Sequence, residues 1–213
     1  MKINVEIWSD VMCPFCYLGK HKFENALAQF AGKNEVELEW KSFQLNPELV
    51  TDTTISIDQY LADIKGFPVE QARQMNNRLT NAGKAIGLEY NFDKIVVANS
   101  FRAQNLIHFA KEQGKQNEIE ERLFKAYFTE GKNVDDIPTL VILATETDLK
   151  IDGLYEVLEN QTYSDNVQKD IAEARQLGIH GVPFFIFNRK YVVSGAQDSS
   201  VFLETLKKAV LLK

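Results

Sequence analysis

The sequence predicts an α/β fold in which a large all-helical subdomain interrupts a small sheet domain. Residues 3–8 and 36–43 alternate apolar and polar side chains on either side of a helical stretch, which is typical of a β-α-β unit. Two strand-like runs, 183–187 and 190–195, follow near the end of the chain. The apolar spacing from about residue 56 to residue 177 is helical, and a segment of about 120 residues is too long for a loop.

The first three elements follow from simple patterns. Ile3, Val5 and Ile7 lie on one face of the first strand. A helix is expected after Pro14, because proline suits the first turn, and it should end at Gly32. Residues 36–43, VELEWKSF, alternate again and predict a second strand, which a helix of this length can join in parallel to the first.

The middle of the chain predicts several helices separated by glycines. One helix should begin near Pro138, and Gly178 should follow the last helix of the set. After it, Asn188-Arg189 forms a two-residue turn between two strands, and a final helix includes Val201 and Leu206. We therefore expect residues 1–50 and 178–213 to form the sheet domain and residues 51–177 to form the helical subdomain.

Composition limits the partners of the protein. The 213 residues carry a net charge of −6 and have a pI of about 5.2, which argues against nucleic acid or an anionic membrane surface as the main partner. No apolar run approaches the roughly 20 residues of a membrane span, and the first ten residues do not resemble a signal peptide. We therefore expect a cytoplasmic protein, in which two cysteines are too few for a disulfide scaffold.

Cys13 and Cys16, the only cysteines, form a C-P-F-C motif whose role has three candidates: metal ligands, a buried thiol pair or a redox pair. A structural zinc site needs four ligands, and the nearest histidine, His21, is poorly spaced from Cys16, so no metal is expected. Placement at a strand-to-helix junction disfavours inert core thiols. The unpaired N–H groups of a helix start favour the thiolate of Cys13, while Cys16 lies one turn further on. The spacing therefore predicts a redox pair of moderate poise, because Pro14 and Phe15 add no charge.

A second motif, G-I-H-G-V-P-F-F at residues 178–185, places Pro183 at the start of a strand. The residues alone do not decide whether the peptide bond before Pro183 is cis or trans.

Together these motifs resemble the DsbA-like family of thioredoxin-fold proteins, and within it the cytosolic FrnE-like branch. That branch is grouped with 2-hydroxychromene-2-carboxylate isomerases and kappa-class glutathione transferases. The resemblance runs nearly end to end, through the stretches 9–19, 43–47, 98–110, 123–131, 181–197 and the final helix. It implies a thioredoxin-like fold whose helical insertion lies between the second and third strands.

The resemblance also implies roles for individual residues. Cys13 would be the nucleophile and Cys16 the resolving thiol, with a cis Val182–Pro183 bond beside the Cys13 sulfur. The backbone of Val182 would pair with an extended substrate segment, and Pro14 and Phe15 would border it. The isomerase and transferase relatives carry serine at the position of Cys13, so cysteine here favours redox chemistry.

Other candidate substrate contacts have a structural alternative. His180 is expected on the Cys13 side, where it either helps to hold the thiolate or is an exposed loop residue. Asn99 either lines the substrate cleft or caps a helix, and Gln104 stands where relatives often have histidine. Relatives that use glutathione hold its γ-glutamyl end near the start of the last helix. The matching positions are Gln197, Asp198 and Ser199; alternatively, Asp198 or Ser199 only caps that helix.

The sequence therefore predicts a cytosolic thiol–disulfide oxidoreductase acting on protein or small-molecule disulfides. It would have no tightly bound cofactor and would use glutathione at most as a co-substrate. One alternative is a glutathione-dependent transferase or isomerase of a small hydrophobic molecule, and another is a binding module with vestigial thiols. The sequence does not decide between a monomer and a homodimer.

Overall fold

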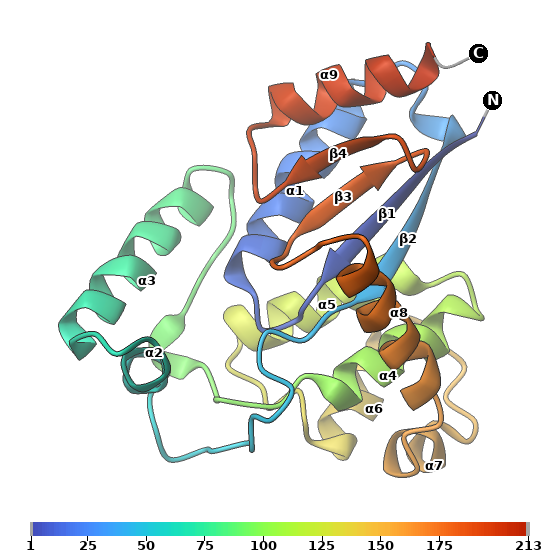
Figure 1. The fold of residues 1–213 in the computed structure, drawn as a ribbon. Coiled ribbons are helices and arrows are strands. Elements are labelled where there is room, and N and C mark those ends of the chain that lie inside the picture. The colour runs from blue at the N-terminus through green and yellow to red at the C-terminus, as the bar shows by residue number, and fades with distance from the viewer. Residues whose placement is uncertain (1, 212–213) are drawn as a thin grey trace. The chain divides into compact units, whose positions relative to one another are not determined.

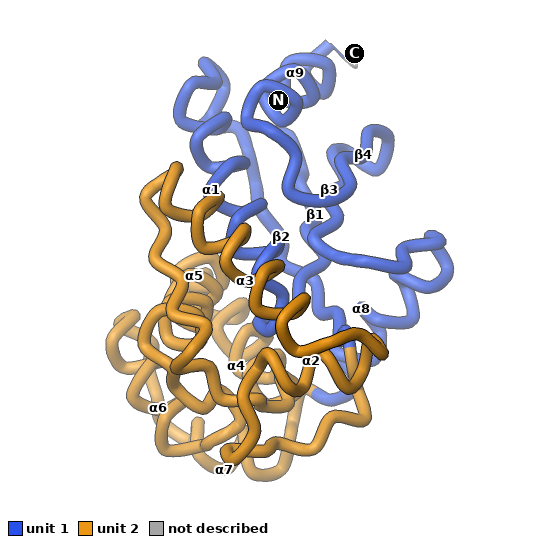
Figure 2. Tube along the Cα trace, turned by 90° about the vertical axis from the view of Figure 1, so that its left-hand side faces the viewer, with its two compact units in different colours: residues 1–45, 164–213 blue, residues 46–163 orange. Residues whose placement is uncertain are grey.

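The fold is taken from a computed structural model, which describes residues 2–211. The chain divides into two compact units, one of residues 1–45 and 164–213 and the other of residues 46–163, coloured separately in Figure 2. The expected boundaries followed residues 50 and 177, whereas the units divide after residues 45 and 163. The second boundary lies earlier because the helix α8 (Ser164–Gln176) packs against the strand β2 of the sheet.

The first unit is built on a four-stranded sheet (Figure 1). Its strands are β1 (Ile3–Ser9), β2 (Val36–Ser42), β3 (Phe184–Phe187) and β4 (Tyr191–Ser194), in the order β2-β1-β3-β4. β1 and β2 run parallel, while β3 is antiparallel to both β1 and β4. The helix α1 (Pro14–Gln29) and the short 3-10 helix η1 (Lys33–Glu35) connect β1 to β2, and α9 (Ser199–Val210) ends the chain. The predicted β-α-β start and terminal hairpin are thus confirmed.

The β3–β4 turn has the backbone that a tight hairpin requires. Asn188 and Arg189 both adopt positive φ, 50° and 55°. Two central residues with φ > 0 define the turn whose twist matches the flanking strands, and asparagine tolerates this region well. The predicted two-residue turn is confirmed.

One face of the sheet is covered by α1 and α9. Phe23 of α1 lies 5.6 Å from the ring of Phe185 on β3 and 5.7 Å from the ring of Phe202 on α9. All three side chains are buried, and Phe187 joins them from the same face of β3. Because these rings lock α1 onto the sheet, the N-terminal end of α1 is held at one end of β1.

The opposite face of the sheet packs against α8. Trp8, Ile186, Ala174 and Ile179 form a buried apolar cluster there. The indole N–H of Trp8 donates to the backbone oxygen of Asp170, 3.0 Å away. The alternation of the strands thus separates two faces, as the period of two predicts.

A partly buried ion cluster lies on this second face. Lys41 of β2 pairs with Asp170 at 3.2 Å and with Glu173 at 3.3 Å, both on α8. Arg189 pairs with Glu173 at 2.7 Å and also with Glu6 of β1. Burial opposes the charge on Lys41, but its carboxylate neighbours outweigh this effect and raise its pKa. The cation therefore stays charged although its side chain is only 12% exposed.

The second unit is helical. Its helices are α2 (Ile57–Lys65), α3 (Val69–Lys84), α4 (Phe101–Lys111), α5 (Gln116–Phe128), α6 (Ile137–Glu146) and α7 (Leu154–Glu159), with a 3-10 turn, η2 (Phe92–Lys94). Its core includes Leu106, Leu123, Phe124 and Leu140, each fully buried. Pro138 lies in the first turn of α6, as predicted.

Within residues 2–211, no helix combines the length and the apolar character that crossing a bilayer requires.

Candidate active site

The two cysteines lie at the start of α1 with different environments. Cys13 is the N-cap residue, with extended backbone (φ −90°, ψ 109°), and Pro14 occupies the first helical turn. The backbone oxygen of Cys13 accepts the N–H of Cys16 at 2.9 Å, and the thiol of Cys13 is close enough to Cys16 to affect its pKa. Both are free thiols, 4% and 1% exposed. This places two sulfurs within reach of each other at a helix N-terminus, as the motif predicts.

Cys16 is the thiol that stays protonated. Its burial raises its pKa well above the ordinary thiol value, and the hydrogen bond and charge of Cys13 act in the same direction. Hydrogen bonds from the backbone of Asp10 and the side chain of Ser9 oppose this shift only in part. An unreactive, protonated thiol beside a second cysteine is what a resolving residue requires, because it must not attack before the mixed disulfide has formed.

The loop before β3 approaches Cys13. The Val182–Pro183 peptide bond is cis, as the family resemblance implies. The Cys13 thiol donates to the backbone oxygen of Val182 at 3.5 Å, a sulfur hydrogen bond that joins segments 169 residues apart in sequence. Pro183 is buried, and its oxygen accepts the N–H of Gly195 at 2.8 Å, which ties the loop to the end of β4. Cys13, Cys16, Val182 and Pro183 therefore lie together at the start of α1.

The remaining residues near the motif are more exposed. Phe15, between the cysteines, is 47% exposed, and Pro14 is partly buried. His180 is exposed in the loop that leads to Pro183. An exposed aromatic ring beside a thiol can offer an apolar contact to a substrate. Substrate binding by Phe15 stays a prediction.

Asn99 makes structural hydrogen bonds within the helical unit. Its side-chain oxygen accepts the N–H of Phe101 at 2.8 Å, and its amide nitrogen donates to the oxygen of Leu49 at 2.7 Å. This is the helix-start role that the sequence allowed as an alternative, although Ser100 holds the N-cap position of α4. Contact of Asn99 with a substrate remains a prediction.

The start of α9 differs from the capping that the sequence suggested. Asp198 has the N-cap position, yet within the described chain its carboxylate caps no N–H of the helix and instead pairs with Lys22 of α1 at 2.9 Å. The Gln197 amide donates to the oxygen of Ser194 at 2.9 Å, and Ser199 is the first helical residue. Side-chain capping by Asp198 is therefore wrong, because a lysine from another helix competes for the carboxylate. Glutathione contacts at these three positions remain predictions.

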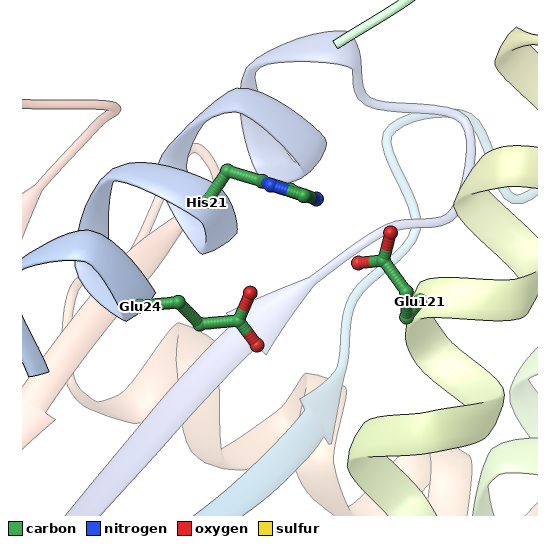
Figure 3. A group of neighbouring side chains, drawn as sticks. All are labelled: His21, Glu24 and Glu121. Carbon is green, nitrogen blue, oxygen red and sulfur yellow. The ribbon is translucent and has the colours of Figure 1, made fainter. Parts of the chain in front are cut away.

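His21 and Glu24 are a second pair of ligand-type side chains in the first unit. They lie on α1 with a ring nitrogen and a carboxylate oxygen within 4.8 Å of each other, as drawn in Figure 3. The third residue labelled there, Glu121, belongs to α5 of the helical unit. Two donors on one helix are fewer than the three or four protein ligands of a zinc site, so we assign no metal to this pair.

Asp10 is a site residue that the sequence pattern does not single out. Its side chain is fully buried, and the carboxylate accepts the N–H of Met12 at 3.2 Å and of Leu45 at 2.7 Å. Its backbone oxygen accepts the N–H of Cys13 at 2.9 Å. The available signal is an aspartate directly before a turn, whose side chain commonly accepts the backbone N–H two residues further on. Asp10 thus fixes the turn that carries Cys13.

Comparison with known proteins identifies the family. A family model described as the DSBA-like thioredoxin domain matches residues 4–207, so the chain belongs to the DsbA-like thioredoxin family. This family contains thiol–disulfide oxidoreductases, in agreement with the adjacent thiols of Cys13 and Cys16. The four-stranded sheet with its helical insertion is accordingly a thioredoxin-like fold of the DsbA type.

Individual relatives agree with this assignment. The chain is 33% identical over 204 residues to the Bacillus subtilis (strain 168) protein called "Uncharacterized protein YwbO", covering 95% of this chain and 94% of the relative. It superimposes with a TM-score of 0.91 on a structure named "probable DsbA oxidoreductase SCO1869" from Streptomyces coelicolor, at 35% identity over 99% of this chain and 91% of that one. "Cytosolic disulfide reductase DsbM" from Pseudomonas aeruginosa, at 16% identity and a TM-score of 0.67 over 99% of this chain and 100% of that one, shares the fold.

Proposed function

We propose that this protein is a cytosolic thiol–disulfide oxidoreductase of the FrnE-like branch in which Cys13 attacks and Cys16 resolves. The observation that carries the proposal is the inequality of the two thiols. Cys13 is the N-cap residue of α1 and lies beside the Val182 carbonyl, whereas Cys16 lies one turn further on and has a raised pKa. A thiolate is the attacking species in disulfide exchange, so a pair in which Cys16 keeps its proton leaves Cys13 to attack first.

The reaction needs only the two thiols and a disulfide substrate. The Cys13 thiolate attacks one sulfur of the substrate disulfide, the S–S bond breaks, and one substrate sulfur leaves as a thiolate that takes up a proton. Cys16 then loses its proton and attacks the Cys13 sulfur, which releases the second substrate thiol and leaves a Cys13–Cys16 disulfide. Two electrons have passed to the substrate. Two molecules of a thiol such as glutathione then return the enzyme to the dithiol through a mixed disulfide and leave as one disulfide.

The substrate side of the proposal rests on the surface near Cys13. The Val182 backbone precedes β3, and an extended segment can pair with such a backbone while an exposed Phe15 ring contacts its side chains. The proposed substrates are therefore protein disulfides and small-molecule disulfides. Glutathione is proposed as a co-substrate, with Gln197, Asp198 and Ser199 as candidate contacts for its γ-glutamyl end. A cytoplasmic location is supported by the fold shared with a protein named cytosolic disulfide reductase.

The test is catalysed reduction of insulin disulfides with glutathione as the reductant. We expect the wild-type protein to accelerate the reaction and Cys13→Ser to lose at least about 10³-fold in rate, because removal of a nucleophile leaves only binding and positioning. Circular dichroism of the Cys13→Ser variant must show a retained fold. A Cys13→Ser variant that reduces insulin as fast as the wild type contradicts the proposal.

The same Cys13→Ser variant distinguishes the redox function from the alternative, a glutathione-dependent transferase or isomerase. Serine occupies the position of Cys13 in those relatives, so that function predicts that Cys13→Ser keeps full turnover with a small hydrophobic substrate and glutathione. A variant that is inactive in both assays, beside a wild type active in disulfide reduction, supports the redox function.

A further inference from the structure

Gly19 occupies a place in α1 where glycine is unfavourable for the helix itself. It lies in the second turn, three residues after Cys16, and it is buried. Glycine in a helix interior is less favourable than alanine because it loses more backbone entropy on folding. A buried helical glycine therefore usually marks a close approach of another segment.

The segment that approaches is the loop of the cis proline. A Cβ atom added at Gly19 would lie 2.9 Å from the Cγ atom of Pro183, closer than real side chains come. On its other side the same atom would lie 3.5 Å from the Cα of Ala196. The segments that carry Pro183 and Ala196 are tied to each other, because the Pro183 oxygen accepts the N–H of Gly195. Lys22 Nζ of α1 also donates to the Ala196 oxygen at 3.2 Å. An added methyl group therefore has little room to be accommodated by movement of either loop.

We infer that Gly19 is a positioning residue of the redox site: its missing side chain lets α1 approach Pro183 and so keeps the Val182 carbonyl on the Cys13 sulfur. This inference rests on the proposed function of the cysteine pair. The pyrrolidine ring is rigid and is bonded directly to Val182, so a displaced ring carries the Val182 oxygen with it. The Cys13–Val182 hydrogen bond already spans 3.5 Å, so a further displacement of the Val182 oxygen from the Cys13 sulfur weakens it.

The consequence is a change in the dithiol–disulfide equilibrium. The Val182 oxygen accepts the S–H of reduced Cys13, a bond that a disulfide sulfur cannot donate. Gly19→Ala should weaken this bond and thereby destabilise the dithiol form relative to the disulfide. Since a typical hydrogen bond contributes about a few-fold to tenfold to an equilibrium constant, we expect a shift of about two- to tenfold toward the disulfide in glutathione buffers.

The matched control is Gly181→Ala. Gly181 lies in the same loop, one residue before Val182, but a Cβ atom there would meet no atom within 4 Å. It should leave the equilibrium unchanged. The partner in the contact is tested by Pro183→Ala, which removes the Cγ atom: in that background Gly19→Ala should cause no further shift. The rate of Cys13 alkylation at fixed pH gives a second readout that needs no turnover, and it should change in Gly19→Ala but not in Gly181→Ala.

Several results would overturn the inference. These are a Gly19→Ala variant with wild-type equilibrium and alkylation rate, an equal shift in Gly181→Ala, or an undiminished shift in the Pro183→Ala background. If Gly19→Ala does not fold, folding of the double variant supports the contact, and failure of both refutes it. A wild-type protein that forms no Cys13–Cys16 disulfide contradicts the proposed function, whereas a normal wild type with an insensitive Gly19→Ala contradicts this inference alone.

Discussion

The Cys16→Ser variant is expected to accumulate as a stable mixed disulfide with its substrate through Cys13. Without the second thiol, the first exchange step proceeds but the intermediate has no internal route to resolution. Turnover in disulfide reduction should fall by at least about 10³-fold, as for other residues that act together in one chemical step. Denaturing electrophoresis without reductant, followed by mass spectrometry, measures the adduct and its site.

The matched control is Cys13→Ser, which retains only Cys16. Because Cys16 is 1% exposed and its raised pKa keeps it protonated, this variant should form adducts far more slowly. Equal adduct formation by the two variants would mean that the thiols are equivalent, and the assignment of Cys13 as nucleophile would fail.

The Lys41→Met variant is expected to lose about 3–5 kcal/mol of the free energy of unfolding, because removal of one partner leaves buried charge uncompensated. Lys41 contacts Asp170 and Glu173, and its side chain is 12% exposed while that of Asp170 is 6% exposed. Methionine matches the lysine stem in length, so the change removes charge rather than volume. Urea unfolding at neutral pH measures the difference.

Lys2→Met is the matched control for this prediction. Lys2 pairs with Glu37 across β1 and β2, but the two side chains are 76% and 50% exposed. Loss of such a surface pair should cost at most about 1 kcal/mol. If Lys41→Met is as mild as Lys2→Met, the partly buried ion cluster does not stabilise the sheet unit.

The cost of Lys41→Met should also shrink as the pH falls. Burial raises the pKa of Glu173, but Arg189 and Lys41 outweigh it, so the folded-state pKa lies below its usual value. The ionised form thus stabilises the wild type above the unfolded pKa of about 4.3, and this contribution is lost as the pH falls through the lower folded value. The variant lacks Lys41 and therefore has less of this contribution to lose. A gap that widens in acid would contradict this explanation.

The order of elements was predictable because each depends on local pattern. Alternation marks β1 and β2, Pro14 marks the start of α1, and the turn residues Asn188 and Arg189 mark the hairpin. The placement of α8 beside β2 was not predictable in the same way. Its apolar spacing is that of any amphipathic helix and does not say which surface it covers.

Some residues of the candidate site were likewise predictable from the sequence and others were not. Cys13 and Cys16 can be recognised from spacing and from the helix start, and the cis bond before Pro183 follows from family resemblance. Gly19 and the Lys22–Asp198 pair could not be predicted, because each depends on two segments that meet only in the folded chain. Distances between such segments are set by packing, which one sequence does not reveal.

The most direct test of the central claim is an equilibrium titration of the Cys13–Cys16 pair in glutathione buffers, read by mass spectrometry after acid quenching. The account predicts one reversible two-electron transition to an intramolecular disulfide, with a potential between the values of about −270 mV for thioredoxin and −120 mV for DsbA. A protein that remains a dithiol throughout, or that only takes up glutathione at Cys13 without forming the internal disulfide, would contradict it.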